Sequence, residues 1–486
     1  MKKTKTPTHI AERKIISSVE DEIFFDTKMK ILNRIYNAGV KHYRKILSEL
    51  YETDEYEQAI AVWEKDKDRK SVRAVFDLLR ACGITEYNIH SYLGVGKQRA
   101  YGSGININFV QKVGSSLWKS ISKVVFTGKL PHFRKRGHTN SFSGKNNSTG
   151  IIYKGGDTVS VMGRMIRLKP IRESDWYLKK SLNHRVKYCT IIRKPTKTGY
   201  EYYLQIVLEG ESPKKLIKGS EMCGLDEGTS TLAFYSGDDL QFIELCPKIK
   251  KYNNAIKKAS RHYQRRARIN NPDCYNKDGT FKKGTKIRNR TNGMRKALFE
   301  LKCAYRRKSE YVKQFHNHLA NMLISKADTF IKEPMDFKAL ARRAKETSRK
   351  DKEEFVKNKK GEKKLVRKYK RKKRFGKSVT DCSPGYLNAV LVHKAEQYGC
   401  HMIDVDKMKY RASQFHHDTG EYRKPKLSER TKVIDGHTVQ RDLYSSFLLY
   451  HIQDLETPDI NSCINDFNNF LELQNKIHSS NPNFGL

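Results

Sequence analysis

Three acidic residues stand at the ends of apolar segments, where they could hold the metal ions of a phosphodiester-cleaving site. Asp226 closes the apolar run 222–225, and Glu333 closes a second apolar run. Asp442 opens an apolar segment with the periodicity of a helix. Hydrolysis by two divalent ions needs several carboxylates at one point, because ions about 3.5–4 Å apart must bind both the attacking and the leaving oxygen.

Each acid taken singly also has an ordinary structural explanation. An Asp at the end of a strand often forms a turn, and an Asp at the start of a helix often caps it. Here an apolar strand delivers Asp226 to a turn that contains Gly228, and the same arrangement precedes Glu333. The order and setting of the three acids together favour a shared site over three separate structural roles.

The charge of the chain indicates a polyanionic partner. The 486 residues include 97 Lys and Arg against 53 Asp and Glu, a formal net charge of +44, which is an electrostatic footprint typical of nucleic-acid binding. No run of about 18 apolar residues is present to span a membrane. The first 16 residues do not resemble a secretory signal, and the nine cysteines include no C-x-x-C pair. We therefore expect a cytoplasmic protein with reduced thiols and no membrane partner.

The amino-terminal part of the chain predicts helices and then strands. Apolar residues recur every three or four positions in three segments, which indicates a helical module over roughly the first quarter; the segments are 26–51, 72–79 and 109–125. After Pro131, runs rich in β-branched and aromatic residues predict antiparallel strands; the runs are 158–168, 186–193 and 201–208.

From residue 222 onward the pattern predicts a mixed α/β layer that would position the three acids. Three leading strands are followed by alternating helices and strands, which is the ribonuclease-H type of arrangement. The predicted strands are 222–226, 231–235, 241–245, 329–333 and 401–405, and the predicted helices are 296–325, 383–398 and 442–452. The segment 345–377 is roughly half Lys and Arg, so we expect it to be mobile unless it binds an anion.

The chain resembles the TnpB nucleases of transposons and their descendants, the miniature type V CRISPR effectors. The resemblance covers residues 130–452 and rests on these segments: Gly224-Leu-Asp-Glu-Gly228 for the first RuvC motif, Phe330-Ile-Lys-Glu333 with Met335-Asp-Phe337 for the second, Arg441-Asp-Leu-Tyr-Ser-Ser-Phe447 for the third, Arg374-Phe-Gly-Lys377 with Ser383-Pro-Gly-Tyr386, Lys394-Ala-Glu396, and 131–141.

The resemblance implies an α/β multidomain, bilobed protein. Its recognition lobe would combine a wedge-like β barrel with an inserted helical domain, and its other lobe would be a RuvC, ribonuclease-H-like nuclease. The implied boundaries are 1–25 and 127–218 for the wedge-like β-barrel domain, 26–126 for the helical recognition domain, 219–410 and 441–455 for the RuvC domain, 411–440 for an insertion that binds target nucleic acid, and 456–486 for a C-terminal tail.

The resemblance also implies a function and its partners. The protein would bind a structured guide RNA, read a short motif beside its target, pair the RNA with one strand of double-stranded DNA, and cut with a single RuvC site in a prokaryotic cell. Asp226, Glu333 and Asp442 would hold two Mg²⁺ ions, for which Mn²⁺ could substitute. We expect a monomer, with a dimer as the alternative. Candidate nucleic-acid contacts are Phe133, Arg134, Lys135, Arg374, Lys377 and Arg441.

The sequence departs from this family at its zinc ribbon. Many relatives carry two cysteine pairs between the last strand and the final Asp, whereas this chain has His416 and Thr419 at the first pair and Lys432 and Asp435 at the second. One imidazole with these partners makes a poor tetrahedral zinc site, which prefers thiolate and imidazole ligands. We therefore expect no zinc and an insertion that persists without metal.

Two other functions remain open from the sequence alone. The first is an RNA-guided DNA-binding repressor that does not cut, and the second is a guide-independent transposase or accessory nucleic-acid-binding protein. The presence of all three acids weighs against the first, and copurification of one defined small RNA would exclude the second. The sequence does not separate a transposon-encoded homing nuclease from a CRISPR effector.

Overall fold

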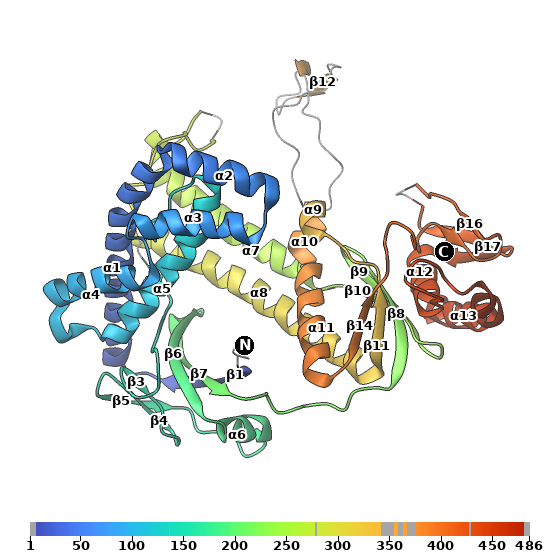
Figure 1. Ribbon diagram of the computed structural model, residues 1–486, viewed down its shortest axis with the longest axis horizontal. Helices are drawn as coiled ribbons and strands as arrows, with labels where there is room; N and C mark the ends of the chain where they lie inside the picture. Colours follow the sequence, from blue (N-terminus) through green and yellow to red (C-terminus); the bar gives the residue numbers. More distant parts are fainter. Residues whose placement is uncertain are drawn as a thin grey trace. The chain divides into compact units, whose positions relative to one another are not determined.

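The computed structural model describes residues 6–480, apart from Arg136, Asp278, 342–353, 358–362, 367–375 and 427–428. The chain forms two compact units, Met1–Pro213 and Lys214–Leu486, each of which combines helices with a sheet (Figure 1). The protein is therefore a mixed α/β protein. No helix in the described part of the chain is long and apolar enough to cross a bilayer.

Helices dominate the first part of the amino-terminal unit. They are α1 (Val19–Tyr51), α2 (Asp54–Asp66), α3 (Arg69–Ala81), α4 (Glu86–Tyr101) and α5 (Ile107–Val124). A capping box starts α1, in which Ser18 and Asp21 satisfy each other's backbone N–H groups. The apolar stripe of α1 is fully buried at Phe25, Val40 and Leu47, so the periodicity of the sequence corresponds to a packed core.

A seven-stranded sheet completes the amino-terminal unit. Its strand order is β2-β6-β7-β1-β5-β4-β3, and contacts of β3 with β6 nearly close it into a barrel. The strands are β1 (Thr8–Ile16), β2 (Ser141–Ser143), β3 (Ile151–Ile152), β4 (Thr158–Val161), β5 (Arg164–Leu168), β6 (Val186–Pro195) and β7 (Tyr200–Glu209), and the short helix α6 (Trp176–Leu182) lies between β5 and β6 in the chain. All neighbouring strands pair antiparallel.

A five-stranded sheet organises the carboxy-terminal unit. Its order is β10-β9-β8-β11-β14, with β8, β11 and β14 parallel and β9 and β10 antiparallel. The strands are β8 (Glu221–Glu227), β9 (Thr231–Tyr235), β10 (Leu240–Glu244), β11 (Ala327–Lys332) and β14 (His401–Asp404). Each strand coincides within a residue or two with a strand that the sequence predicts.

Helices cover both faces of this sheet. One apolar core joins the sheet to α8 (Asn292–Lys326) and α11 (Pro384–Tyr398). A second joins its other face to α12 (Arg441–Tyr450) and α13 (Ile460–Ser480). The basic helix α7 (Ile249–Asn270) packs against α8, and α9 (Phe337–Ala341) and α10 (Gly376–Cys382) flank the stretch that is only partly described.

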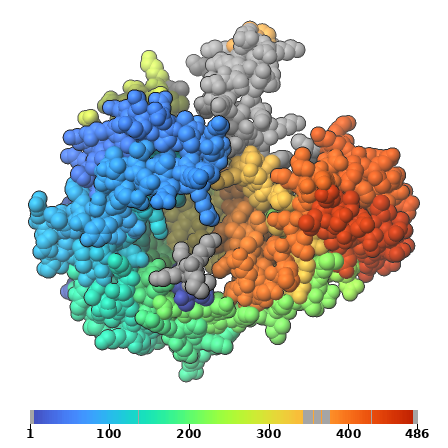
Figure 2. Space-filling model, viewed as in Figure 1, coloured from blue at the N-terminus to red at the C-terminus, as the bar shows by residue number. Residues whose placement is uncertain are grey.

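The region named as a C-terminal tail contains α13. Cys463, Phe467 and Phe470 are buried in the core that α13 shares with α12. In Figure 2 the insertion and the last two helices, orange to red, form one closely packed mass. The last helix therefore helps to hold α12, which carries Asp442, against the sheet.

Much of the expected mobile linker lies outside the described residues. Two strands within it, β12 (Glu354–Lys357) and β13 (Lys363–Val366), pair antiparallel. The candidate contact Arg374 also lies outside the described residues, whereas Lys377 is exposed in α10.

Candidate active site

The register of two parallel strands brings Asp226 beside Glu333. In the last pair that links β8 to β11, Leu225 stands opposite Lys332, so the next residue along each strand is an acid. Both acids therefore lie at the carboxyl ends of parallel strands, the edge at which open α/β sheets usually bind ligands. The sheet thus joins two residues that are far apart in the sequence.

A close approach of α12 to β8 places Asp442 over the same strand end. A Cβ at Gly224 would lie 2.0 Å from the carbonyl oxygen of Ser446 and 2.6 Å from the backbone nitrogen of Tyr450. Gly224 and Asp226 share one face of β8, because side chains alternate along a strand. Asp442 precedes Ser446 by one helical turn. The start of α12 therefore lies toward Asp226.

Asp226 is affected by the charges of the other two acids. Burial raises the pKa of Asp226 well above its usual range, and the charges of Asp442 and Glu333 raise it further. Burial also raises the pKa of Glu333, although a hydrogen bond of 2.7 Å from the backbone N–H of Ala412 opposes that shift. No hydrogen bond or ion pair from the described residues reaches the Asp226 carboxylate, and the positive charge of Arg441 only partly opposes the rise in its pKa.

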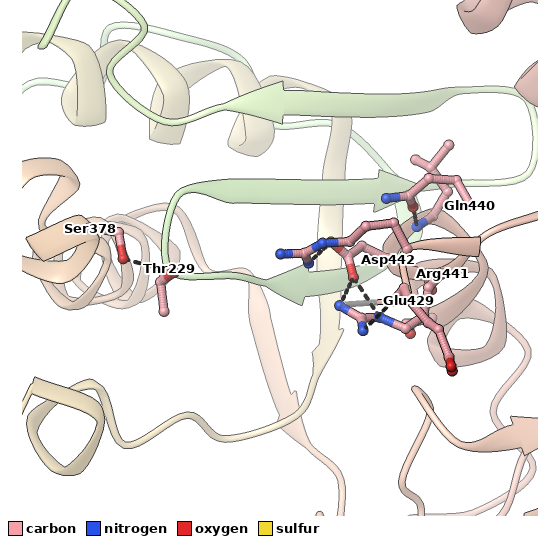
Figure 3. A network of polar contacts seen from close by, with 9 residues as sticks. Thr229, Ser378, Glu429, Gln440, Arg441 and Asp442 are labelled. Carbon is pink, nitrogen blue, oxygen red and sulfur yellow. Dashed lines mark hydrogen bonds and ion pairs between the residues drawn. The ribbon is translucent and has the colours of Figure 1, made fainter. Parts of the chain in front are cut away.

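Two arginines contact the third acid, one at the start of α12 and one just before β17 (Thr431–Ile434). The guanidinium of Arg441 donates to Oδ1 of Asp442 from Nε at 3.1 Å and from Nη2 at 3.0 Å, and it also donates to the carbonyl of Glu429. Arg430 lies 3.8 Å from Oδ2 of Asp442. Figure 3 shows Arg441 turned toward Asp442, and Gln440 caps the start of the helix by accepting from Leu443.

The donor set suits a hard divalent cation. Carboxylate oxygens are the ligands that Mg²⁺ and Mn²⁺ prefer, and Asp226 has both oxygens uncommitted within the described structure. Among the residues described, however, no three His, Cys, Asp or Glu side chains are gathered as closely as metal ligands are. Ligation by all three acids would therefore require Arg441 to release Asp442 and the carboxylates to turn toward one another.

A hydroxyl pair fixes the turn after Asp226. Ser378 in α10 donates to the hydroxyl of Thr229 at 3.1 Å (Figure 3). Because Thr229 lies between β8 and β9, this bond ties the turn next to the acid to a helix from a distant part of the sequence. Neither this bond nor the contact at Gly224 has a signal in the sequence pattern, since both depend on tertiary approach.

The three candidate nucleic-acid contacts near residue 133 differ in how far their side chains are free to bind a partner. Phe133 is 51% exposed, with the guanidinium of Arg44 5.3 Å from its ring centroid. Lys135 is exposed. Arg134 instead donates to Ser116 at 2.6 Å and stacks 3.6 Å from the ring centroid of Tyr36. This arrangement favours a packing role for Arg134 and leaves Phe133 and Lys135 as candidates for contact with nucleic acid.

A cationic ridge on α7 is a candidate that the sequence pattern does not single out. Lys257, Arg261 and Arg265 are exposed and follow one another at four-residue spacing, so they share one face of the helix. They line a surface hollow. The 22 residues of α7 include no Asp or Glu, and within the described structure these three cations form no ion pair. The absence of acids along a long helix was the available sequence signal.

We expect the α7 ridge to contribute to RNA binding through phosphate contacts. Replacing Lys257, Arg261 and Arg265 together by glutamine should weaken binding of the copurified RNA and lower the slope of log affinity against log salt by about 2–3, because each lost phosphate contact removes about 0.7–0.9. Filter binding at several salt concentrations measures this slope.

The matched control removes three other exposed cations. Lys45, Arg73 and Arg80 are also exposed on helices, but each lies within 4 Å of a carboxylate of its own helix. Their triple glutamine variant carries the same net charge and should keep the wild-type salt slope. Slopes lowered equally in both triple variants would show that the ridge acts only through net charge, and a wild-type slope in both would show that the ridge makes no phosphate contact.

The insertion forms two small hairpins. They pair β15 (Phe415–His416) with β16 (Glu421–Tyr422), and β17 (Thr431–Ile434) with β18 (His437–Gln440). The side chain of Lys432 is buried, and its Nζ donates to the carbonyl of Phe415 at 3.2 Å, which joins the two hairpins. His416 is buried beside Phe415 in β15. The absence of zinc remains a prediction. The buried amine of Lys432 provides a link between the hairpins that needs no metal.

The stability of the insertion should depend on the charge of Lys432. Burial lowers the pKa of Lys432 from 10.5 to about 8. Between these values the unfolded chain binds more protons than the folded chain, so the free energy of unfolding should rise with pH from about 8 to about 10. Lys432→Met should remove this rise and raise Tm at pH 7. Thermal unfolding of both proteins between about pH 8 and about pH 10 tests the expectation. The same dependence of Tm on pH in wild type and Lys432→Met would contradict it.

Comparison with solved structures gives several matches, two of which are described here. No family model matches the chain, and no curated protein matches it in sequence. A cryo-EM structure of a Cas12f1–sgRNA–target DNA complex is 11% identical with a TM-score of 0.44, and the match covers 91% of this chain and 98% of that one. A CRISPR–Cas12f ternary complex is 12% identical with a TM-score of 0.27, covering 89% and 82%. These identities and TM-scores are too low to assign a family or a function, so a proposed function depends on the site itself.

Proposed function

We propose that this protein is an RNA-guided DNA endonuclease with one RuvC-type site formed by Asp226, Glu333 and Asp442. The observation that carries the proposal is the approach of these three acids at the carboxyl ends of β8 and β11. They come from the three segments that resemble the RuvC motifs of TnpB-family nucleases. Phosphodiester hydrolysis is the chemistry that such a carboxylate set supports.

The three acids would act together in this reaction. Asp226, which accepts no hydrogen bond in the described structure, would hold the divalent ions together with Glu333 and Asp442. Bound Mg²⁺, or Mn²⁺ in its place, would supply Lewis-acid activation of water and stabilisation of the leaving 3′ oxygen. Arg441 would then exchange its contact with Asp442 for one with the scissile phosphate, since a planar guanidinium binds both groups in the same way.

The charge of the chain supports two nucleic-acid partners. A guide RNA and a double-stranded DNA target would both be neutralised by the excess of 44 positive charges. Sequence recognition would come from base pairing between the RNA and the target strand, while the protein would read a short flanking motif. The α7 ridge would bind phosphates of the RNA.

The proposal is tested by expressing the protein with its native flanking DNA and sequencing the RNA that copurifies. The complex is then assayed on a plasmid library with Mg²⁺. One structured RNA with guide-matched, Mg²⁺-dependent cuts is the expected result. Heterogeneous RNA without programmed binding would contradict the proposal and favour an accessory nucleic-acid-binding protein.

The same experiment separates a nuclease from a repressor. Guide-dependent binding of the target without cuts, in Mg²⁺ and in Mn²⁺, would show an RNA-guided DNA-binding protein that does not cleave. The flanking DNA then distinguishes the two origins, because a repeat array indicates a CRISPR effector and a transposon end indicates a homing nuclease.

A further inference from the structure

A buried ion pair lies beneath the candidate site, on the opposite face of the same two strands. Glu227 follows Asp226 in β8, and Lys332 precedes Glu333 in the chain at the end of β11. Because side chains alternate along a strand, Glu227 and Lys332 point away from the face that carries the two acids. Nζ of Lys332 lies 3.7 Å from Oε2 of Glu227, and these side chains are only 5% and 4% exposed.

Lys332 contacts two further elements at the same end of the sheet. Its Nζ donates to Oδ1 of Asn388 in α11 at 3.1 Å and lies 3.6 Å from Oδ1 of Asp404. Asp404 is the direct partner of Lys332 across the β11–β14 pairing. One ammonium group therefore links the ends of three neighbouring parallel strands and the helix that covers them.

Stability alone gives no reason for a carboxylate at position 227. Both oxygens of Glu227 are buried without a hydrogen bond in the described part of the protein, and 3.7 Å to Lys332 is longer than a hydrogen bond. Burial raises the pKa of Glu227, and the charge of Lys332 only partly opposes this. Apolar residues of similar volume in place of such a pair are often neutral or stabilising.

We propose that Glu227 and Lys332 are positioning residues, whose ion pair fixes the ends of β8 and β11 against each other and so sets the separation of the Asp226 and Glu333 carboxylates. The inference rests on the proposed function, because it concerns the same site. Each member of the pair is the immediate neighbour of one acid, so a shift of either strand end moves that acid directly. Partners that orient metal ligands typically change metal affinity or activity by about 10–100-fold when they are replaced.

The test replaces both charges with apolar side chains of similar length. The variant carries Glu227→Met and Lys332→Met and is studied as the complex with its RNA. We expect Tm to be unchanged or higher and guide-dependent DNA binding to be unchanged. The Mg²⁺ concentration for half-maximal cleavage should rise by about 10-fold or more. Mn²⁺ affinity, measured by calorimetry without turnover, should fall by the same factor.

A control variant makes the same chemical change at the opposite end of β11. Lys326, just before the strand, lies 2.6 Å from Asp239. Lys326→Met with Asp239→Leu should leave the Mg²⁺ requirement and the Mn²⁺ affinity at wild-type values. A Met double variant with wild-type values of both quantities would overturn the inference. If the Met double variant does not fold, Glu227→Gln is used in its place, because it removes the charge and keeps the shape of the side chain. An unchanged Mn²⁺ affinity of Glu227→Gln would again overturn the inference.

Failure of the proposed function gives a different pattern from failure of this inference. A wild-type complex that binds Mn²⁺ but does not cut would contradict the nuclease, while the Mn²⁺ affinities of wild type and variant would still decide the positioning role. A wild-type protein that binds no Mn²⁺ would contradict both.

Discussion

Asp226→Ala is expected to abolish DNA cleavage while guide-dependent DNA binding keeps its wild-type affinity. The carboxylate of Asp226 lies at the end of β8, where the charges of Glu333, just after β11, and Asp442, on α12, both act on it. Removing it takes away one of the three acids that would hold the divalent ions, on which the proposed hydrolysis depends. Binding of DNA depends on base pairing and on phosphate contacts, and Asp226 contributes to neither. Cleavage of a labelled target and filter binding with the same complex measure the two effects.

The isosteric variant adds a prediction about stability. The pKa of Asp226 is raised in the folded protein, so the folded state disfavours the ionised form. The free energy of unfolding should therefore fall as pH rises from the pKa of Asp226 in the unfolded chain to its higher pKa in the folded protein. Asp226→Asn should therefore raise Tm at neutral pH in the absence of divalent ions. Mg²⁺ should raise the Tm of wild type, because an ion that binds only the folded state stabilises it, and should have little effect on the variant.

The control for Asp226 lies on the hairpin formed by the next two strands. Asp238 is exposed in the turn between β9 and β10, and Asp238→Ala should cut DNA at the wild-type rate. Cleavage by Asp226→Ala would contradict the site. Loss of DNA binding together with cleavage would instead show that Asp226 supports the fold or the nucleic-acid interface.

The five strands of the central sheet and the helices α8, α11 and α12 could be predicted from the sequence because each has a strong local pattern. The strand at Thr231–Tyr235 coincides with its expected range, and α11 begins after Ser383 with Pro384 at its first position, where a missing N–H costs nothing. Short apolar runs bounded by turn residues mark strands that are buried on both faces. Local patterns of this kind predict where each strand or helix lies in the chain, but they do not predict which other strands and helices it packs against.

The approach of the acids depends on tertiary contacts that no local pattern contains. Glu333 stands beside Asp226 only because β11 pairs with β8 in one particular register. The buried pair of Glu227 and Lys332 is likewise formed across that register. Local patterns place both acids at strand ends, and the family resemblance joins them into one site. Neither of these indicates that Arg441 contacts Asp442.

The last helix had a readable pattern that its polar residues obscured. In α13 the apolar residues Cys463, Phe467 and Phe470 recur at three- and four-residue spacing, but asparagines and charged residues fill the positions between them. The core with α12 buries Cys463, Phe467 and Phe470 and leaves Leu471, Leu473 and Ile477 partly buried. An apolar stripe on a polar helix is the pattern most easily mistaken for a tail.

Gly224→Ala is expected to lower the cleavage rate by about 10²-fold. The substitution should displace Asp442 on α12 while all three acids keep their side chains. The added Cβ would lie 2.0 Å from the carbonyl oxygen of Ser446, and a backbone contact at that distance can be relieved only if α12 shifts by about 1 Å or more. A misplacement of about 1 Å in a catalytic group can cost about 10²-fold in rate. Overpacking of this kind also costs about 1–3 kcal/mol of stability, which thermal unfolding would measure.

Two comparisons separate displacement of α12 from general loss of stability. A Cβ added at Gly96 in α4 would meet no atom within 4 Å, so Gly96→Ala should leave cleavage unchanged and gain up to about 1 kcal/mol of helix stability. Gly224→Ala assayed well below its Tm should bind guided DNA normally and still cut slowly. A Gly224→Ala protein that is less stable but cuts at the wild-type rate would show that the contact of α12 with β8 stabilises the fold without setting the position of Asp442.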